Sequence, residues 1–262
     1  MAKKRKKKQK SKLWMLLIVT VVVAMAYYFG MAYFAEEKEM EAAKMANYAV
    51  FGINIPNNYT IHGIDVSSHQ NFIHWPSIKE MKLHNVQIDF AFMKATEGLN
   101  DVDQRFKQNW LAAQQNHLVR GAYHFFIATK TGKEQAQHYI KTVQLQKGDL
   151  PPVLDIEELY GVDPVLVRTR VKEWLETIEA YYQVKPIIYS NADFYDRVLG
   201  NDFLDYPLWI AYYLDKDQPP IHRDWLFWQY SDRGRVNGVT TKVDFNVFNG
   251  DSLKFRQILL QY

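Results

Sequence analysis

From residue 61 onwards, short runs rich in β-branched and aromatic residues alternate with longer polar or amphipathic segments. Such runs, bounded by turn residues, predict β-strands. Three longer segments between the earlier runs have helical patterns, and the last of them begins with Asp163 as a plausible N-cap and Pro164 at the first helical position. The pattern therefore predicts eight strands, over residues 61–66, 90–94, 119–126, 153–157, 186–190, 208–212, 226–230 and 243–247, and helices over 104–115, 133–144 and 164–182.

Strands that alternate with helices predict a parallel sheet, and eight of them in one α/β domain predict a closed barrel. The segments between the last three strands are too short for full crossover helices, so we expect the final third of the barrel to lack them. An open doubly wound sheet is the alternative. No G-x-G-x-x-G or G-x-x-x-x-G-K-[ST] motif follows a strand, so the sequence predicts no phosphate-binding loop.

The N-terminal region has a different pattern, because residues 13–35 contain no charged side chain. A helix of this length covers the ~30 Å hydrocarbon core of a bilayer. Eight Lys or Arg residues precede it within residues 1–12, and an acidic run follows it. The positive-inside rule then places the N-terminus in the cytoplasm. We predict a basic cytoplasmic tail (1–12), a transmembrane signal anchor (13–35), a stalk or linker (36–60) and a barrel domain (61–262).

The alternative for the N-terminus is a cleaved signal peptide, with Ala24-Met25-Ala26 as the cleavage site. The protein would then be secreted after loss of residues 1–26. Both interpretations export the domain across the cytoplasmic membrane.

Charge and composition limit the function of the domain. The whole chain has a net charge of +3, but outside the first twelve residues 24 basic side chains stand against 29 acidic ones. An acidic domain argues against nucleic acid as its ligand. The absence of cysteine excludes disulfides, thiolate nucleophiles and cysteine-based zinc sites. The eight His residues form no H-E-x-x-H motif, so we expect neither a metal nor a cofactor.

The stretch PPVLDIEEL at 151–159 places two carboxylates at the end of an apolar strand. Asp155 and Glu157 are two residues apart and share a face, at the strand end where parallel barrels carry their active sites. Burial and mutual repulsion should raise the pKa of one of them, which gives a protonated acid beside an ionised partner. Glycoside hydrolysis needs this arrangement. The alternative is that both acids face solvent, where they are capped or paired with lysine.

Other strand ends favour the active-site interpretation. Asp65 ends the first strand and Asp244 lies in the last, so in a closed barrel both flank the same mouth. Four converging acids cost solvation free energy unless a cation, such as a metal ion or an oxocarbenium-like transition state, binds among them. Aromatic residues at the strand ends could stack on pyranose rings, with core packing as the alternative for each: Tyr123, Phe125, Tyr189, Trp209, Tyr212, Trp228 and Tyr230.

With these residues assembled, the chain resembles the glycoside hydrolase family 25 lysozymes, the Chalaropsis-type N-acetylmuramidases, from about residue 62 to residue 250. The segments that carry the resemblance are GIDVSSHQ (63–70), KATEG (94–98), GAYHFF (121–126), LDIE (154–157), IIYS (187–190), LWIAYY (208–213), WQYS (228–231) and VDFNVFNG (243–250). The resemblance implies a flattened TIM-like (β/α)5β3 barrel. It also implies hydrolysis of the β-1,4 bond between N-acetylmuramic acid and N-acetylglucosamine.

Carried over to this sequence, the resemblance implies that Glu157 is the general acid/base. Asp155 would orient and polarise the 2-acetamido group of the substrate, which in one proposed mechanism is itself the nucleophile. Asp65 and Asp244 would complete the acidic groove. We expect Gln229 to reach the groove, and Lys94 to form an internal ion pair with Glu97 rather than touch substrate.

We expect peptidoglycan strands as the partner of a monomeric domain, with the membrane as a second partner through the N-terminal helix. Two other functions stay open. One is a non-catalytic cell-wall glycan-binding protein on the same scaffold, which could lose Glu157 without penalty. The other is a structural envelope protein that bridges the membrane and the wall.

Overall fold

The computed structural model describes residues 19–34, 45–48, 50–83, 86–214 and 217–261, and the chain forms two compact units, residues 1–46 and 47–262. The first unit contains a helix over residues 19–34. Among the described residues, no helix combines the length and the apolar character that a membrane crossing needs. Residues 13–18 and 35 of the predicted span lie outside the described residues, as do the basic tail and residues 36–44 of the predicted stalk.

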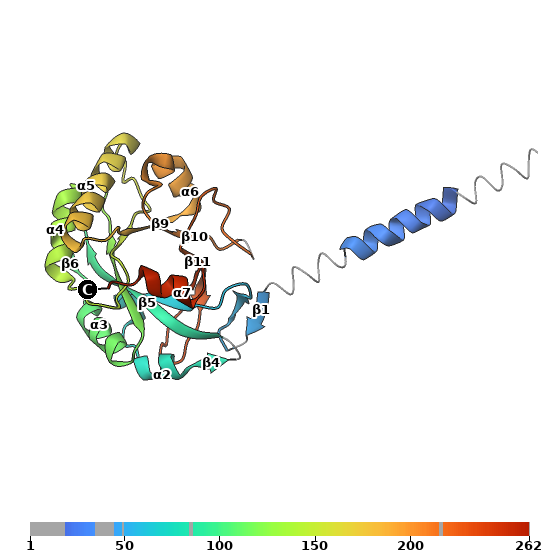
Figure 1. Ribbon diagram of the computed structural model, residues 1–262, viewed down its shortest axis with the longest axis horizontal. Helices are drawn as coiled ribbons and strands as arrows, with labels where there is room; N and C mark the ends of the chain where they lie inside the picture. Colours follow the sequence, from blue (N-terminus) through green and yellow to red (C-terminus); the bar gives the residue numbers. More distant parts are fainter. Residues whose placement is uncertain (1–18, 35–44, 49, 84–85, 215–216, 262) are drawn as a thin grey trace, which may run out of the picture. The chain divides into compact units, whose positions relative to one another are not determined.

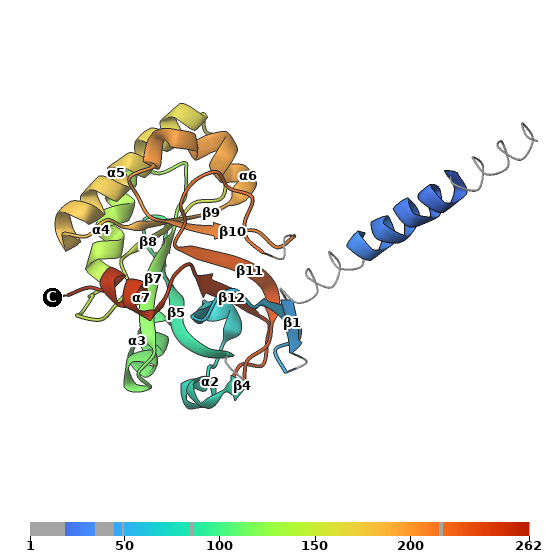
Figure 2. The ribbon, with the colours of Figure 1, turned by 45° about the vertical axis from the view of Figure 1, so that its right-hand side comes forward.

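The second unit is built on a closed eight-stranded barrel (Figures 1 and 2). The sheet runs in the order β3-β12-β11-β10-β9-β8-β7-β5, and an additional pairing of β3 with β5 closes it. All eight strands predicted from the sequence are present: β3 (His62–Val66), β5 (Val86–Glu97), β7 (Val119–Phe125), β8 (Val153–Asp155), β9 (Ile187–Asn191), β10 (Leu208–Ala211), β11 (Phe227–Gly234) and β12 (Val243–Phe248).

One strand departs from the parallel arrangement that we expected. β12 pairs antiparallel with both β11 and β3, whereas the other neighbouring strands of the barrel are parallel. The connection from β11 to β12 is short, and a short connection returns the chain antiparallel to the strand it has just left. The start of β12, and not its end, therefore lies at the carboxyl end of the parallel strands.

Helical segments follow the first five barrel strands and none separates the last three, which confirms the (β/α)5β3 arrangement. The helix after β8 is α5, whose predicted N-cap is present, since the Asp163 side chain accepts a hydrogen bond from the Val165 amide at 2.8 Å. The helical segments in chain order are α2 (Trp75–Glu80), α3 (Phe106–Gln115), α4 (Gly132–Thr142), α5 (Pro164–Tyr182) and α6 (Ala192–Phe194) with the turns η2 (Tyr195–Leu199) and η3 (Gly200–Phe203).

Aromatic rings fill the barrel below its mouth. The Phe92 ring stacks on Trp209 at 4.3 Å between centroids, and Phe90 contacts Phe227 at 5.1 Å. These rings fit because glycine faces them: a Cβ at Gly121 would lie 2.4 Å from the Phe92 ring. The C-terminal helix α7 (Ser252–Ile258) adds Phe255, which contacts Phe90 and so covers the amino end of the strands. Side chains thus fill the interior of the barrel below its carboxyl end.

The domain begins earlier in the chain than the predicted boundary at residue 61. Phe51 and Ile55 are buried in the main core, and the Phe51 ring contacts Phe245 at 5.6 Å. The Arg235 amide also donates a hydrogen bond to the Phe51 carbonyl at 2.9 Å. Residues 51–60, which the sequence analysis placed in a linker, therefore belong to the folded domain. The smaller elements are β1 (Met45–Tyr48), β2 (Ile53–Pro56), η1 (Ser68–Gln70), β4 (Lys82–Leu83) and β6 (Asp101–Val102).

Candidate active site

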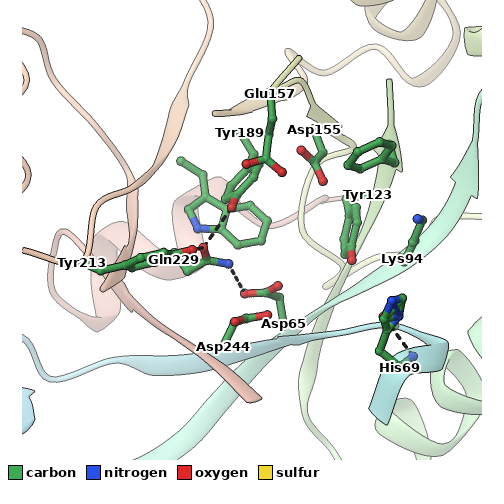
Figure 3. A pocket seen from close by; sticks show the side chains of 13 residues that line it. Asp65, His69, Lys94, Tyr123, Asp155, Glu157, Tyr189, Tyr213, Gln229 and Asp244 are labelled. Carbon is green, nitrogen blue, oxygen red and sulfur yellow. Dashed lines mark hydrogen bonds between the residues drawn. The ribbon is translucent and has the colours of Figure 1, made fainter. Parts of the chain in front are cut away.

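A pocket of about 280 Å³ opens at the carboxyl end of the parallel strands (Figure 3). All four acids predicted from the sequence line it, although they come from three separate parts of the chain. The lining residues are Asp65, Ser67, His69, Lys94, Tyr123, Phe125, Asp155, Glu157, Tyr189, Trp209, Tyr213, Gln229 and Asp244.

The backbone around β8 explains why Asp155 and Glu157 face the pocket together. Asp155 is the last residue of the strand, and its carbonyl accepts a hydrogen bond from the Phe126 amide at 2.8 Å. The Ile156 amide donates to the Tyr189 carbonyl at 3.0 Å, so extended pairing continues past the strand end. Ile156 points outward into the core between barrel and helices. Alternation then turns Asp155 and Glu157 inward.

Asp155 and Glu157 form a coupled carboxyl pair whose side chains share a hydrogen bond. Burial raises the pKa of Asp155 well above its ordinary value, and the negative charges of Glu157 and Asp65 add to this effect. Burial also raises the pKa of Glu157, while its hydrogen bonds to Asp155 and Asn191 act in the opposite direction. A hydrogen bond between two carboxyl groups requires one proton, so the pair holds a proton where isolated carboxyls would be ionised.

Asp65 and Asp244 form a second carboxyl pair across the pocket. They are directly opposite each other in the antiparallel register of β3 and β12, and their side chains share a hydrogen bond. Burial raises the pKa of Asp65, and burial together with the charge of Asp65 raises the pKa of Asp244 to about 9. The reversed direction of β12 is what brings Asp244 to this mouth.

Two amide side chains hold Asp65 in place. Its Oδ2 atom accepts hydrogen bonds from Gln229 Nε2 at 2.8 Å and from Asn246 Nδ2 at 2.7 Å. Gln229 Oε1 in turn accepts from the hydroxyl groups of Tyr189 at 2.9 Å and Tyr213 at 2.6 Å. The acidic half of the pocket is therefore a connected network rather than four independent side chains.

Comparison with known proteins identifies the family of the chain. The profile described as "Glycosyl hydrolases family 25" matches residues 64–239. The chain belongs to this family. It is therefore a glycoside hydrolase, and the alternative of a non-catalytic glycan-binding protein is set aside.

Individual proteins are similar to this chain over most of its length. Protein YegX of Escherichia coli (strain K12) is 45% identical over 200 residues, which are 76% of this chain and 74% of YegX. Lysozyme M1 of Streptomyces globisporus is 34% identical over 213 residues, covering 74% of this chain and 69% of that protein. The structure of a family 25 glycosyl hydrolase from Bacillus anthracis superposes with a TM-score of 0.72 at 33% identity, covering 79% of this chain and 96% of that one.

Most of the predicted substrate-binding residues of this glycoside hydrolase line the pocket: Tyr123, Phe125, Tyr189, Trp209 and Gln229. Tyr212 does not, because it lies beyond the end of β10 and packs against the core outside the barrel. Its neighbour Tyr213 lines the pocket instead. Trp228 and Tyr230 are buried in the same outer core, as the packing alternative predicted.

Lys94 places a cation in the lining of the pocket. Its Nζ atom lies 2.6 Å from Glu97 Oε2 and 4.7 Å from the centroid of the Phe125 ring, so the predicted ion pair is present. Lys94 also lines the pocket, and its charge opposes the upward shift of the Asp155 pKa. Lys94 therefore both forms a structural ion pair and contributes to the pocket.

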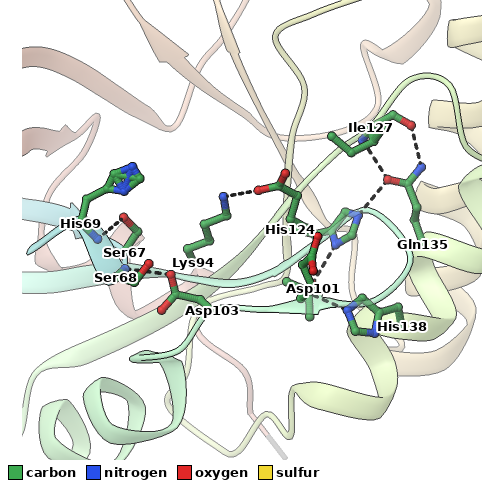
Figure 4. Close-up of polar contacts among 12 residues, drawn as sticks. Ser67, Ser68, His69, Lys94, Asp101, Asp103, His124, Ile127, Gln135 and His138 are labelled. Carbon is green, nitrogen blue, oxygen red and sulfur yellow. Dashed lines mark hydrogen bonds and ion pairs between the residues drawn. The ribbon is translucent and has the colours of Figure 1, made fainter. Parts of the chain in front are cut away.

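Polar contacts hold the segments that carry Lys94, in β5, and His69, in η1 (Figure 4). The Ser68 amide donates to Asp103 Oδ2 at 2.7 Å, which ties η1 to the segment after β6. His124, behind the site, contacts Thr96 at 2.7 Å and Gln135 at 3.2 Å. Burial lowers the pKa of His124 to about 3, so it is neutral and serves as a structural residue.

Sequence reasoning missed four members of the site: Ser67, His69, Tyr213 and Asn246. Asn246 had a usable signal, because it lies two residues after Asp244 in a strand and so shares its face. Ser67 and His69 lie in a turn whose direction no strand periodicity gives. Among the described residues, no three His, Cys, Asp or Glu side chains are arranged to hold a metal ion.

Proposed function

We propose that this family 25 enzyme hydrolyses peptidoglycan at the β-1,4 bond between N-acetylmuramic acid and N-acetylglucosamine, with Glu157 as general acid/base. The observation that carries the proposal is the buried, hydrogen-bonded pair of Asp155 and Glu157 on one wall of an open pocket. Glycosidic bond cleavage requires a carboxylic acid that stays protonated near neutral pH beside an ionised carboxylate. The relatives named lysozyme support peptidoglycan as the substrate.

Glu157 is better placed than Asp155 to deliver the proton. It is only partly buried, whereas the Asp155 side chain is 7% exposed. A glycosidic oxygen held in the pocket would take the proton from Glu157 as the bond to the anomeric carbon breaks. Glu157, now ionised, would then accept a proton from the incoming water, which restores the acid form.

Asp155 has an unused acceptor that fits the acetamido group of the substrate. Among the described residues, its buried Oδ1 atom has no hydrogen-bond partner. An unsatisfied buried acceptor costs about 1–3 kcal/mol, which a substrate N–H would recover. Such a donor also favours the ionised form of Asp155, so substrate binding would move the shared proton onto Glu157. The acetamido N–H would in this way both align the sugar and prepare the acid.

The test compares two neighbouring glutamates in the full-length protein. Glu157→Gln keeps the shape of the side chain but cannot exchange a proton, so hydrolysis should fall by about 10²–10⁴-fold. Glu158→Gln is the matched control, because Glu158 is exposed and does not line the pocket. Loss of turbidity of purified peptidoglycan measures the rate. Reducing-end analysis of the products separates a muramidase from a glucosaminidase or an amidase, and equal activity of wild type and Glu157→Gln would contradict the proposal.

We also propose that the enzyme acts outside the cytoplasmic membrane, to which its N-terminal region anchors it. The supporting observations are the basic cluster at 1–12 and the uncharged run at 13–35. Carbonate extraction of cell membranes tests anchoring, and protease treatment of intact spheroplasts tests the side on which the domain lies. N-terminal sequencing of the mature protein distinguishes an intact anchor from a chain cleaved after residue 26.

A further inference from the structure

Two hydrogen-bond relays converge on one oxygen atom of Asp65. One relay runs from the hydroxyl groups of Tyr189 and Tyr213 through Gln229 to Asp65 Oδ2. The other runs from Trp209 Nε1 to Asn246 Oδ1 at 2.8 Å, and from Asn246 Nδ2 to the same Oδ2 atom. Figure 3 shows Gln229 between the tyrosines and Asp65, with the Asp244 carboxyl group beside that of Asp65.

The Trp209 relay fixes the direction of its hydrogen bonds. An indole N–H can only donate, so the atom of Asn246 that faces Trp209 must be its carbonyl oxygen. The NH₂ group of Asn246 then faces Asp65 and donates to it. The Gln229 relay has the same direction when both tyrosine hydroxyl groups donate to its oxygen. Asp65 Oδ2 therefore accepts two N–H hydrogen bonds, and hydrogen bonds of this kind stabilise the ionised form of a carboxyl group.

Asp244 has no comparable set of donors among the described hydrogen bonds, and it lies directly opposite Asp65 in the register of β3 and β12. A hydrogen bond between the two carboxyl groups needs one proton, and the side without N–H donors holds it more tightly. We propose that Gln229 and Asn246 act as positioning residues that keep Asp65 ionised, and that Asp244 is a neutral acid that donates its proton to Asp65.

The surroundings of Asp244 support a neutral side chain. The acidic groups that raise its pKa are Asp65 on β3, Asp232 on β11 and Glu157 after β8. Tyr123 on β7 and Tyr213 after β10 also lie within electrostatic range, and both are neutral phenols whose pKa is raised. None of these groups is a cation that would favour an ionised Asp244. Burial, which raises the pKa of both aspartates, does not distinguish between them, whereas the two N–H donors of Asp65 do.

The proposal changes the charge that the substrate meets. Each carboxyl pair would hold one proton, so the pocket would carry two negative charges near neutral pH instead of four. Asp65 would be the charged group on its wall, held at a fixed position opposite the Asp155–Glu157 pair. A fixed, preorganised charge stabilises a cationic transition state more effectively than two mobile carboxylates that repel each other.

Carbon NMR of the carboxyl groups tests the assignment directly. The full-length protein is labelled with ¹³C at the aspartate carboxyl carbon, and its spectrum at pH 7 is compared with those of Asp65→Asn and Asp244→Asn. The wild-type signal that disappears in Asp244→Asn should have the chemical shift of a protonated carboxyl. The wild-type signal that disappears in Asp65→Asn should have the chemical shift of an ionised carboxyl. The opposite assignment, or two ionised signals, overturns the proposal. If one variant fails to fold, the other variant still identifies the signal of its own aspartate.

A third variant tests the positioning role of Gln229. Gln229→Leu removes one N–H donor from Asp65 at similar volume, so the Asp65 signal should move toward its protonated position. An unchanged Asp65 signal in a folded Gln229→Leu protein would contradict the role. The inference concerns the same pocket as the proposed hydrolysis and rests on that function for its catalytic meaning. Peptidoglycan turnover by the same wild-type sample is measured in parallel, so failure of the hydrolysis proposal and failure of the proton assignment are separate results.

Discussion

Asp65 and Asp244 are directly opposite each other on two antiparallel barrel strands, and both carboxyl groups point into the active-site pocket. Like charges at opposed positions of an antiparallel pair destabilise a sheet. The two side chains avoid this repulsion by sharing a hydrogen bond, which requires a proton to stay on one of them. The stability of the fold is thereby linked to pH through residues that line the pocket.

We predict that Asp244→Asn makes thermal stability less dependent on pH. The native state raises the Asp244 pKa from 3.8 to about 9, so it binds this proton more tightly than the unfolded chain does. The stabilisation from the proton is complete below pH 3.8 and is lost as the pH rises towards and through 9. The melting temperature of the wild type should therefore fall more steeply between pH 5 and pH 9 than that of Asp244→Asn.

Circular dichroism melts at pH 5, 7 and 9 measure this difference. Asp196→Asn is the control, because Asp196 is an exposed acid that does not line the pocket and is not among the groups that raise the Asp244 pKa. It makes the same side-chain change and should keep the slope of the wild type. Parallel slopes for all three proteins would refute the link between stability and the proton of Asp244.

A second prediction concerns the pH dependence of activity. Burial raises the pKa of Glu157 above its ordinary value of 4.5, so the acid form persists to higher pH and activity should decline on the alkaline side as that proton is lost. The hydrogen bond from Asn191 opposes this shift. Asn191→Ser removes it but keeps a side chain that can cap α6, where Asn191 Oδ1 now accepts from the Phe194 amide at 2.8 Å. The alkaline limb of kcat/KM should therefore move to higher pH in Asn191→Ser.

Rates on a soluble peptidoglycan fragment across pH 4–10 provide the profile. A limb that stays in place, or moves to lower pH, would mean that Glu157 is not the acid or that Asn191 does not influence it. Glu158→Gln again serves as the control for a general loss of negative charge near the site. Its limb should shift less than that of Asn191→Ser, because Glu158 is exposed to solvent and its effect is screened.

A third prediction separates two adjacent tyrosines. Tyr213→Phe removes one of the two hydroxyl groups that donate to Gln229, at a cost of about 1 kcal/mol or roughly fivefold in kcat/KM. Tyr212→Phe should leave kcat/KM within about twofold of wild type, since the Tyr212 ring packs outside the barrel. Steady-state kinetics of both variants decide the point. A larger loss in Tyr212→Phe would restore Tyr212 to the substrate-binding set.

The tyrosine pair also illustrates what the sequence could predict. Runs of β-branched and aromatic residues located all eight barrel strands, and the spacing of two between Asp155 and Glu157 correctly placed both on one face. Tyr212 was assigned because it is an aromatic residue at the end of the predicted strand 208–212, although it lies three residues from Trp209. A shift of one residue exchanges the two faces, and alternation counted from Trp209 would have selected Tyr213, which lines the pocket even though β10 ends at Ala211.

Strand direction was the other property that periodicity could not give. An alternating or apolar run reads the same in a parallel and an antiparallel strand, so the antiparallel direction of β12 was missed. We predicted Asp244 at the mouth because we expected the carboxyl ends of parallel strands to bring the acids together. The position is correct, but the strand that carries Asp244 is antiparallel. Asn246, on the same face, was not predicted as a site residue, because its amide side chain is uncharged. The hydrogen bonds that organise Asp65 became apparent only with the three-dimensional arrangement.

The last prediction tests the N-terminal boundary of the folded domain. Phe51 was assigned to a linker because the Pro-Asn-Asn turn at 56–58 suggested that the domain began after it, yet its ring is fully buried against Phe245. Phe51→Ala should lower the free energy of unfolding by about 3–5 kcal/mol, as for other buried aromatic residues. Val50→Ala is the matched control, since the Val50 side chain is 51% exposed and its loss should cost little. Urea unfolding of the two variants measures the difference, and equal midpoints would show that residues 51–60 are a linker after all.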